Sequence, residues 1–395
     1  MTPRSVVITS GVRTPIGVFG GALAGHPPTQ LAALCVTEAL RRADLPGERV
    51  EHVVFGNVIV TEPRDAYLAR VAGIEGGVSK EAPALTLNRL CGSGVQAIIS
   101  AAQSIMLGDA EVAVAGGAEC MSRAPHLLHA GRFGQRMGDV DVVDHLTGIL
   151  TDPFGHGIMG ITAENVAERW QIGREEQDAF ALESQRRAGA AIEAGRFRDQ
   201  ILPVEVRRGR ATIQFDTDEH PKPGTTAAAL ASLRPAFRKD GSVTAGNSSG
   251  VNDGAAAVVL MDEELAHREG RSALARIVGY AHAGVEPAEM GIGPVPAVRR
   301  LLERTGLDIG DFEVIESNEA FAAQACAVAR DLKFDPARAN PNGGGIALGH
   351  PVGATGAILV VKAAYELARI GGRYALVTMC IGGGQGIALA IERTG

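Results

Sequence analysis

The sequence predicts an α/β protein built from two similar halves, with one helical layer shared between two sheets. Residues 92–119 (GSGVQAIISAAQSIMLGDAEVAVAGGAE) and residues 353–383 (GATGAILVVKAAYELARIGGRYALVTMCIGG) carry the similarity. Each segment contains a glycine turn, a helical stretch, a glycine, a strand-like run and a second glycine turn. A duplication explains this order, although helix and strand alternate so commonly that chance similarity is the alternative.

The two repeated helical stretches are unusually free of charge. No charged residue lies between Arg89 and Asp109, and residues 357–368 contain only Lys362 and Glu366. Apolar helices of this kind are buried in globular proteins. The first is too rich in glycine, serine and glutamine to span a membrane. The strand-like runs VAVAGG and YALVTM are continuously hydrophobic, which is typical of strands covered on both faces.

A charged segment interrupts the first half. Residues 121–245 contain an amphipathic helical pattern, EEQDAFALESQRRAGAAIEAG, which Gly195 is expected to end. Strand-like character returns in DGAAAVVLM. We therefore expect a first half at 1–120 that is completed by 246–270, an inserted loop subdomain at 121–245, and a second half at 271–395.

Composition sets bounds on the function. The 395 residues are 46% hydrophobic and carry 38 basic and 45 acidic side chains, a net charge of −7. This balance argues against nucleic acid and anionic membranes as partners. The opening segment MTPRSVVITSGVRTPIG has no apolar leader, so a cytoplasmic location is expected. The five cysteines lack CxxC spacing and predict neither a disulfide framework nor a metal site.

One cysteine stands at an unusual place, in the motif NRLCGSG. Cys91 follows the strand-like run 84–87 and precedes the first apolar helix. Unpaired N–H groups and the dipole at a helix N-terminus stabilise a thiolate, which favours a nucleophile. Two alternatives remain. Cys91 is a small buried packing residue, or residues 92–97 form a GxGxxA dinucleotide-binding motif with Glu119 as the ribose-binding acid.

Three further motifs follow strand-like runs. They are SNEAF at 317–321, NPNGGGIALGHP at 340–351 and MCIGGG at 379–384, and they combine turns with polar or nucleophilic side chains. Open α/β sheets bind ligands beyond the carboxyl ends of their strands. If the two halves pack as proposed, these loops converge with Cys91 on one site.

Taken together, the motifs resemble those of the thiolases, the family of acetyl-CoA acetyltransferases and 3-ketoacyl-CoA thiolases. They occur in the family's order over essentially the whole chain: NRLCGSG, GGAECMS, TAENVA, LRPAF, AGNSSGVNDGAA, SNEAFA, NPNGGGIALGHPVGATGA and CIGGGQG. The resemblance implies the thiolase fold, layered α/β/α/β/α. It also implies reversible condensation of two acyl-CoA molecules, or thiolysis of a 3-ketoacyl-CoA, through an acyl-cysteine intermediate. CoA would be a substrate, with no further cofactor, and the protein a homodimer or homotetramer.

The resemblance gives roles to three reactive side chains. Cys91 matches the nucleophile that takes the acyl group, and a thiolate both attacks thioesters and leaves them readily. His350 matches the base that activates it, although a lone histidine is more often a surface or satisfied core residue. Cys380 matches the second cysteine, which moves a proton of the second acyl-CoA and needs a pKa tuned toward neutrality. The other three cysteines match no catalytic motif and are expected to be packing residues.

Further positions match groups that hold the substrate. Asn318 matches the residue that holds a water which, with His350, stabilises the enolate oxygen. The backbone N–H groups of Cys91 and Gly382 match an oxyanion hole. Ser249 matches a pantetheine contact. Three side chains match pocket-lining positions, with an ordinary core role as the alternative: Met159, Met290 and Phe321.

Three positions depart from the family's pattern. Ile158 stands where short-chain members usually have a histidine beside the acyl and pantetheine region, which leaves the chain-length preference open. Lys222 replaces an arginine at the nucleotide end of CoA and keeps the charge without the bidentate geometry. Ala229 replaces a serine in the adenine region, which would weaken CoA binding modestly.

A thiolase-type acyltransferase is therefore predicted, against two alternatives of other classes. An NAD(P)-dependent oxidoreductase that used the GxGxxA stretch would leave Cys380, His350 and Asn318 without a role. A non-catalytic acyl-CoA-binding protein would not need the complete Cys–His–Cys–Asn set. A ketosynthase of the same fold class uses one cysteine with two histidines, and Cys380 occupies one of the corresponding positions.

Overall fold

The computed structural model describes residues 4–395. Residues 1–3, which begin the expected first half and the opening segment, lie outside this described part. A ten-stranded sheet forms the centre in the order β12-β13-β14-β11-β1-β10-β5-β3-β4, with β2 paired to β10. Its strands are β1 (Val6–Arg13), β2 (Gly17–Val18), β3 (His52–Gly56), β4 (Ala84–Leu87), β5 (Val112–Cys120), β10 (Asn252–Asp262), β11 (Ala275–Gly284), β12 (Phe312–Ser317), β13 (Tyr374–Ile381) and β14 (Gln385–Arg393).

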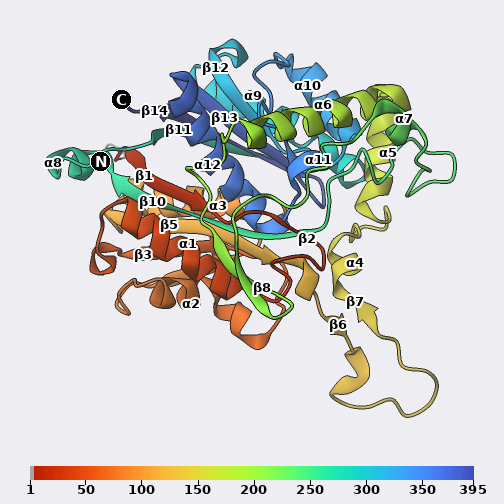
Figure 1. The fold of residues 1–395 in the computed structure, drawn as a ribbon, viewed down its shortest axis with the longest axis horizontal. Helices are drawn as coiled ribbons and strands as arrows, with labels where there is room; N and C mark the ends of the chain where they lie inside the picture. Colours follow the sequence, from red (N-terminus) through yellow and green to blue (C-terminus); the bar gives the residue numbers. More distant parts are fainter. Residues whose placement is uncertain (1–3) are drawn as a thin grey trace.

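Both halves of the chain contribute to this sheet (Figure 1). They meet where Val7 and Ile8 of β1 pair antiparallel with Arg276 and Ala275 of β11. Within the halves, β3 pairs in parallel with β4 and β5, and β12 pairs in parallel with β13. The two expected β layers are therefore parts of one continuous sheet. The sequence pattern did not reveal the pairing of β1 with β11 that connects them.

Helices form three layers around the two parts of the sheet (Figure 1). Between them lie α3 (Ser93–Leu107) and α12 (Val352–Ile370), which pack against each other, and α12 contacts strands of both halves. The outer face of the first part is covered by α1 (Pro28–Arg42) and α2 (Leu68–Glu75), and that of the second part by α9 (Pro294–Thr305). The predicted helical layer between two β layers is confirmed.

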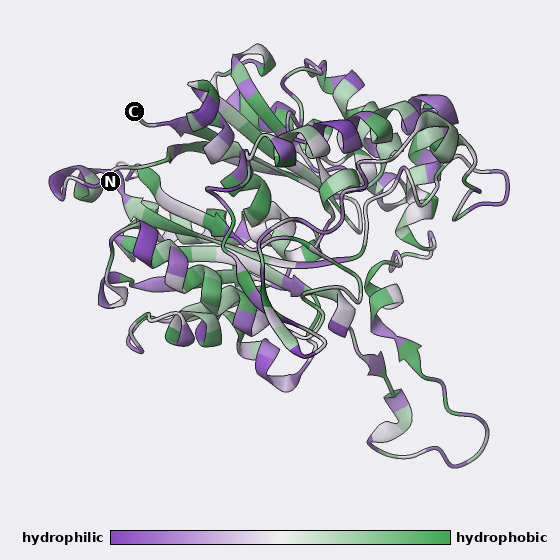
Figure 2. Ribbon diagram, in the orientation of Figure 1, coloured by the Kyte–Doolittle hydropathy of each residue, from purple (hydrophilic) through white to green (hydrophobic). Residues whose placement is uncertain are grey.

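Residues of the central strands alternate between two apolar cores, as the period of two in a strand requires. In β10, Val258 and Leu260 lie in the core shared with α3 and α12, whereas Val259 and Met261 lie in the core under α1 and α2. Hydrophobic residues accordingly follow the strands and the inner helices (Figure 2). The segment Leu90–Leu107 is long and apolar enough for a membrane span, but it packs against α12 and the strands as a core helix.

The chain between β5 and β10 adds a helical cover to the second half. Helices α5 (Met159–Trp170) and α6 (Arg174–Glu193) both pack on α10 (Ala322–Leu332). The predicted end of α6 is confirmed, because Gly195 follows it with a left-handed φ of 67°. The smaller helices are α4 (His145–Ile149), α7 (Ala227–Ala231), α8 (Glu263–Arg268) and α11 (Gly345–Leu348), with 3-10 turns at Gly47–Arg49, Pro63–Tyr67, Met121–Arg123, His129–Gly131, Pro287–Ile292 and Ile309–Asp311.

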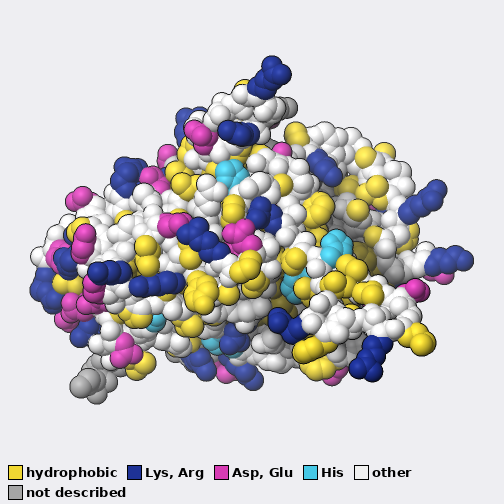
Figure 3. Space-filling model, turned by 90° about the horizontal axis from the view of Figure 1, so that it is seen from below, with side chains coloured by type: hydrophobic (Ala, Val, Ile, Leu, Met, Phe, Trp, Pro, Cys, Tyr) yellow, Lys and Arg dark blue, Asp and Glu magenta, His cyan; other side chains and the backbone are white. Residues whose placement is uncertain are grey.

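A narrow arm projects from the body at the lower right of Figure 1. At its base β6 (His126–Leu127) pairs antiparallel with β7 (Val143–Asp144), and its tip exposes Phe133 (92%) and Met137 (89%). A second hairpin, β8 (Val204–Arg208) with β9 (Ala211–Phe215), lies on the first half. On the face seen from below, basic and acidic side chains are interspersed, as the near balance of charge predicts (Figure 3).

Helices α3 and α12 touch backbone to backbone near their N-termini. A Cβ atom on Gly94 would lie 2.4 Å from the backbone nitrogen of Ala357, and a Cβ atom on Gly356 would lie 2.4 Å from that of Val95. Only glycine permits two such close approaches. The reciprocity of these contacts matches the sequence similarity of the two halves. The contact also brings together the loops that precede both helices.

Replacing Gly94 by alanine should destabilise the protein, because the new methyl group would overlap the α12 backbone. We expect the free energy of unfolding, measured by urea denaturation, to fall by about 1–3 kcal/mol. The matched control is Gly189→Ala in α6, where the Cβ would lie 3.9 Å from the Pro223 side chain and helix propensity predicts a gain of up to about 1 kcal/mol. Equal stability of the two variants would contradict the close contact.

Candidate active site

A cavity of about 60 Å³ lies where the predicted motifs meet. Its walls include the loops before α3 and α12, the turn after β13, and residues from α5 and from the segments before β10 and α10. The side chains and backbone groups that matter for chemistry are those of Cys91, Ser249, Met290, Phe321, His350 and Gly382. The structure thus places residues from both halves around one space.

Cys91 sits on a sharp turn between β4 and α3. The preceding residue, Leu90, has a φ of 45°, a left-handed conformation that is unfavourable for leucine. Ser93 holds the turn, since its Oγ accepts a hydrogen bond from the Arg89 N–H (2.8 Å) and donates one to the Leu90 carbonyl (2.7 Å). This turn fixes the Cys91 sulfur at the cavity wall.

Burial, and not the helix N-terminus, dominates the titration of Cys91. Burial raises the pKa of the Cys91 thiol to about 11, while the backbone N–H groups of Gly382 and of Cys91 itself act in the opposite direction. In the free protein, desolvation therefore opposes the thiolate that the helix N-terminus was expected to favour. The two N–H groups nevertheless face the sulfur, at the place expected for an oxyanion hole.

His350 is buried and held in one tautomer. Its Nδ1 lies 2.6 Å from Thr355 Oγ1, and the Thr355 hydroxyl donates its own proton to the Pro351 carbonyl (2.8 Å). Thr355 must therefore accept from Nδ1–H, which leaves Nε2 unprotonated. The Asn252 side chain accepts a hydrogen bond from the His350 backbone N–H (2.9 Å). Burial lowers the pKa of His350 to about 4, so a neutral imidazole is available to accept a proton.

Asn318 and Cys380 complete the expected group. Asn318 is fully buried, and its Nδ2 lies 3.4 Å from His350 Nε2, as a donor to that lone pair. Cys380 is buried near the end of β13, in one apolar cluster with Met159, Met290 and Ala320. Burial and the nearby Cys91 raise the pKa of Cys380 far above its usual range. In the free protein, burial therefore acts against the tuning toward neutrality that was expected for Cys380.

Glu119 has a structural task that excludes the dinucleotide-binding alternative. Its carboxylate is fully buried and accepts hydrogen bonds from the backbone of Val58 (3.1 Å), Ile59 (3.0 Å) and Gly353 (2.8 Å). It therefore anchors the N-terminus of α12 and is not accessible to a ribose. The GxGxxA glycine at position 94 packs on α12 and leaves no space for a pyrophosphate. The sequence pattern indicated Glu119 only as a ribose-binding acid, because its backbone partners lie at least 60 residues away along the chain. It did not indicate Thr355, although its partners His350 and Pro351 are only five and four residues away.

The remaining expected residues fall into two groups. Met159 lines the cavity together with Ser249, Met290 and Phe321. Ile158 and Lys222 do not line it. Ile158 is half-buried and directly precedes α5, and Lys222 is exposed, with its backbone N–H bonded to the Gln185 side chain (2.8 Å). Ala229 is exposed on α7.

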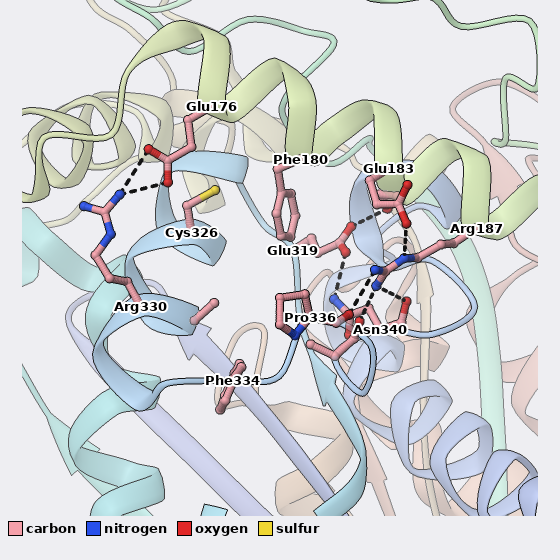
Figure 4. A pocket seen from close by; sticks show the side chains of 13 residues that line it. Glu176, Phe180, Glu183, Arg187, Glu319, Cys326, Arg330, Phe334, Pro336 and Asn340 are labelled. Carbon is pink, nitrogen blue, oxygen red and sulfur yellow. Dashed lines mark hydrogen bonds and ion pairs between the residues drawn. The ribbon is translucent and has the colours of Figure 1, made fainter. Parts of the chain in front are cut away.

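A larger cavity, of about 440 Å³, lies elsewhere, between α6 and α10 (Figure 4). Its charged side chains already pair with one another, Glu176 with Arg330 and Glu183 with Arg187, around an apolar floor that includes Phe334. Ser184 also lines this cavity, but its hydroxyl donates to the buried Glu319 carboxylate (2.6 Å), which accepts a second hydrogen bond from Asn340 (2.7 Å), so this pair serves to hold the structure together. Within residues 4–395, no three His, Cys, Asp or Glu side chains are grouped so that they could hold a metal ion.

Comparison with known protein families covers nearly the whole chain. Residues 6–264 match the model of the thiolase N-terminal domain, and residues 271–393 match that of the thiolase C-terminal domain. The chain is 61% identical over 391 residues to the beta-ketothiolase BktB of Cupriavidus necator, covering 99% of both chains. It is 51% identical over 392 residues to an acetyl-CoA acetyltransferase of Pseudomonas aeruginosa, covering 99% of this chain and 100% of the relative.

Solved structures show the same similarity. The human mitochondrial 3-ketoacyl-CoA thiolase superposes with a TM-score of 0.97 at 45% identity, with 100% of both chains covered. The same human enzyme in complex with CoA gives a TM-score of 0.96, covering 99% of this chain and 98% of that chain. The fold that the sequence predicts is thereby confirmed.

The raised pKa of Cys91 predicts how its reactivity depends on pH. Only the thiolate is alkylated by iodoacetamide, so the rate should rise about tenfold per pH unit from pH 7 to pH 10. N-acetylcysteine is the control, and its rate should level off above its ordinary pKa of about 8.5. The rate would be followed by mass spectrometry of the Cys91 peptide. A plateau below pH 8 would show that a thiolate already exists in the free protein.

Proposed function

Since this chain belongs to the thiolase family and is an acyl-CoA C-acyltransferase, we propose that Cys91 carries the acyl group between its two acyl-CoA substrates. The observation that carries this assignment is the meeting of Cys91, His350 and Gly382 at one cavity, with Cys380 close to Cys91. In condensation the enzyme would join two acyl-CoA molecules, and in thiolysis it would split a 3-ketoacyl-CoA with CoA.

The first half-reaction transfers the acyl group to Cys91. His350 Nε2 takes the thiol proton while the sulfur attacks the thioester carbonyl of the first acyl-CoA. The N–H groups of Cys91 and Gly382 receive the oxyanion, because they already face the sulfur in the free protein. The carbon–sulfur bond to CoA then breaks, which leaves acyl-Cys91, protonated His350 and a CoA thiolate.

The second half-reaction forms the carbon–carbon bond. Cys380 gives its proton to the departing CoA thiolate, so that a Cys380 thiolate stands beside a positively charged His350. Cys380 then removes an α-proton from the second acyl-CoA, and the enolate oxygen is held by His350 Nε2–H and Asn318. The enolate carbon attacks acyl-Cys91, the Cys91–carbonyl bond breaks, and His350 returns its proton to Cys91.

This sequence explains why both cysteines can have raised pKa values at rest. Isolated charges in a buried cavity are disfavoured, but each step above creates a thiolate only together with protonated His350. The proton on His350 balances first the CoA thiolate and then the Cys380 thiolate. The resting site therefore holds three neutral groups: Cys91, His350 and Cys380.

Substrate contacts are assigned by the cavity. Met159, Met290 and Phe321 would surround the acyl group, and Ser249 would contact the pantetheine arm, because all four line the space beside Cys91. Lys222 would meet the nucleotide end of CoA at the surface, where it is exposed. The complex of the human mitochondrial thiolase with CoA supports CoA as the substrate.

We further propose a homodimer or homotetramer located in the cytoplasm. The support for assembly is the edge strand β4, which among residues 4–395 pairs with β3 alone and exposes Leu85 (45%), together with the apolar tip of the arm. We also propose the division into 1–120 with 246–270, 121–245, and 271–395. The two family models support its main boundary, since the first ends at 264 and the second begins at 271.

The two cysteines should separate the two half-reactions. Brief incubation with acetyl-CoA should leave a hydroxylamine-labile acetyl group on Cys91, and Cys91→Ala should abolish it. Cys380→Ser should still be acetylated but lose exchange of acetyl-CoA methyl protons with solvent, by more than about a hundredfold. The control is Cys326→Ala, which is remote from the site and should retain both activities. Acetylation of another cysteine would overturn the mechanism.

Ile158 provides a test of chain-length preference. Ile158 does not line the cavity but directly precedes Met159, which does, so a histidine there would make the surroundings of this wall more polar. Each buried CH₂ of a substrate is worth about 0.8 kcal/mol. We expect the kcat/KM for 3-ketohexanoyl-CoA relative to acetoacetyl-CoA to fall between a few-fold and about tenfold in Ile158→His. If the ratio stays constant or rises, the chain-length preference is set by the residues that line the cavity and not by Ile158.

A further inference from the structure

A second, internal cavity of about 10 Å³ lies beside the catalytic histidine. Its lining combines Gly344, Gly345 and apolar side chains, such as Ile16 and Leu359, with Asn318, Thr355 and Lys362. It therefore touches both side chains that hydrogen-bond to the His350 ring. A cavity of this size accommodates one water molecule if polar groups face it. Cys91 does not line this space.

The hydrogen bonds around His350 fix which end of the Asn318 amide faces this cavity. Thr355 accepts from Nδ1–H, so Nε2 is an acceptor and Asn318 must offer it an N–H. Asn318 Oδ1 therefore points away from His350. It is fully buried and has no hydrogen-bond partner among residues 4–395. A Cβ atom on Gly345 would lie 3.0 Å from Oδ1, so this oxygen faces the wall of the internal cavity.

A buried lysine lines the same cavity. Lys362 lies on α12 with 2% of its side chain exposed, and its Nζ donates to Glu316 Oε2 (2.7 Å) and to the Gly343 carbonyl (2.8 Å). An ammonium group has three protons to donate. In the described part of the chain Lys362 Nζ makes only the two hydrogen bonds just named. Lys362 thus has one N–H left to donate and Asn318 has one oxygen left to accept, and both residues line one small cavity.

We propose that one water molecule occupies this cavity, accepting from Lys362 and donating to Asn318 Oδ1, and that Lys362 is thereby a positioning residue for the enolate-forming step. The hydrogen bonds then run in one direction, from Lys362 through the water and Asn318 to His350 and Thr355. Such chains polarise each member. When His350 becomes protonated, its Nε2 can no longer accept a hydrogen bond. The Asn318 N–H then donates to the substrate oxygen instead, while Asn318 Oδ1 keeps its hydrogen bond from the water.

This inference rests on the proposed roles of Cys91, His350 and Asn318, and its test separates it from them. The test variant is Lys362→Met combined with Glu316→Leu, which removes both charges and leaves no unpaired buried carboxylate. Acetylation of Cys91 in a single turnover should stay within about twofold of the unmodified protein. Exchange of acetyl-CoA methyl protons should fall by about tenfold to a hundredfold, by analogy with the groups that orient the ligands of a metal site.

Two controls distinguish positioning from a general structural effect. Glu316→Gln retains the ammonium group and should keep the exchange rate within about threefold. In an Asn318→Ala background the Lys362→Met/Glu316→Leu pair should cause no further loss, because the side chain it positions is gone. Normal exchange in the test variant, or equal loss of acetylation and exchange, would overturn the proposal. If the unmodified protein is not acetylated on Cys91, the proposed function fails instead.

Should the test variant not fold, as judged by circular dichroism, a high-resolution crystal structure of the unmodified protein decides. Electron density for a water within hydrogen-bonding distance of both Lys362 Nζ and Asn318 Oδ1 is expected. A cavity without density, or a water that contacts only one of the two atoms, would overturn the proposal.

Discussion

The backbone contact between α3 and α12 is the constraint on which the site depends. Gly94 and Gly356 let the N-terminal parts of the two helices approach to a distance that no side chain permits. The loops that precede these helices carry Cys91 and His350, so the contact sets the distance between nucleophile and base. Glu119 secures the same junction from below, because it binds backbone N–H groups at the start of α12 and of the loop after β3.

Burial keeps the titratable groups of this site uncharged in the free protein. It raises the pKa of Cys91 and of Cys380 and lowers that of His350, so each group is neutral near pH 7. Charges created in such a place are stabilised only by partners that are already oriented. The tautomer fixed by Thr355 and the N–H groups at the sulfur are partners of this kind, and they need no rearrangement when a substrate arrives.

The sequence allowed much of the fold and site to be predicted because local patterns encode them. Glycine turns and apolar periodicity located α3, α12 and the strands after them, and the motifs around Cys91, His350 and Cys380 were distinctive enough to indicate a family. What could not be predicted depends on contacts distant in sequence. The pairing of β1 with β11, the anchor at Glu119 and the pKa shifts all arise only when the two halves have packed together.

The left-handed conformation of Leu90 lowers the stability of the fold but fixes the position of the neighbouring nucleophile. A non-glycine residue in this region costs on the order of 1–3 kcal/mol, and the hydrogen bonds of Ser93 help to maintain it. A glycine at position 90 would remove this backbone strain, but it would also let the Cys91 sulfur move away from the N–H groups of Cys91 and Gly382. Attempts to make this enzyme more heat-resistant should therefore leave this turn unchanged. Stabilising substitutions belong in the outer helices, which do not position catalytic groups.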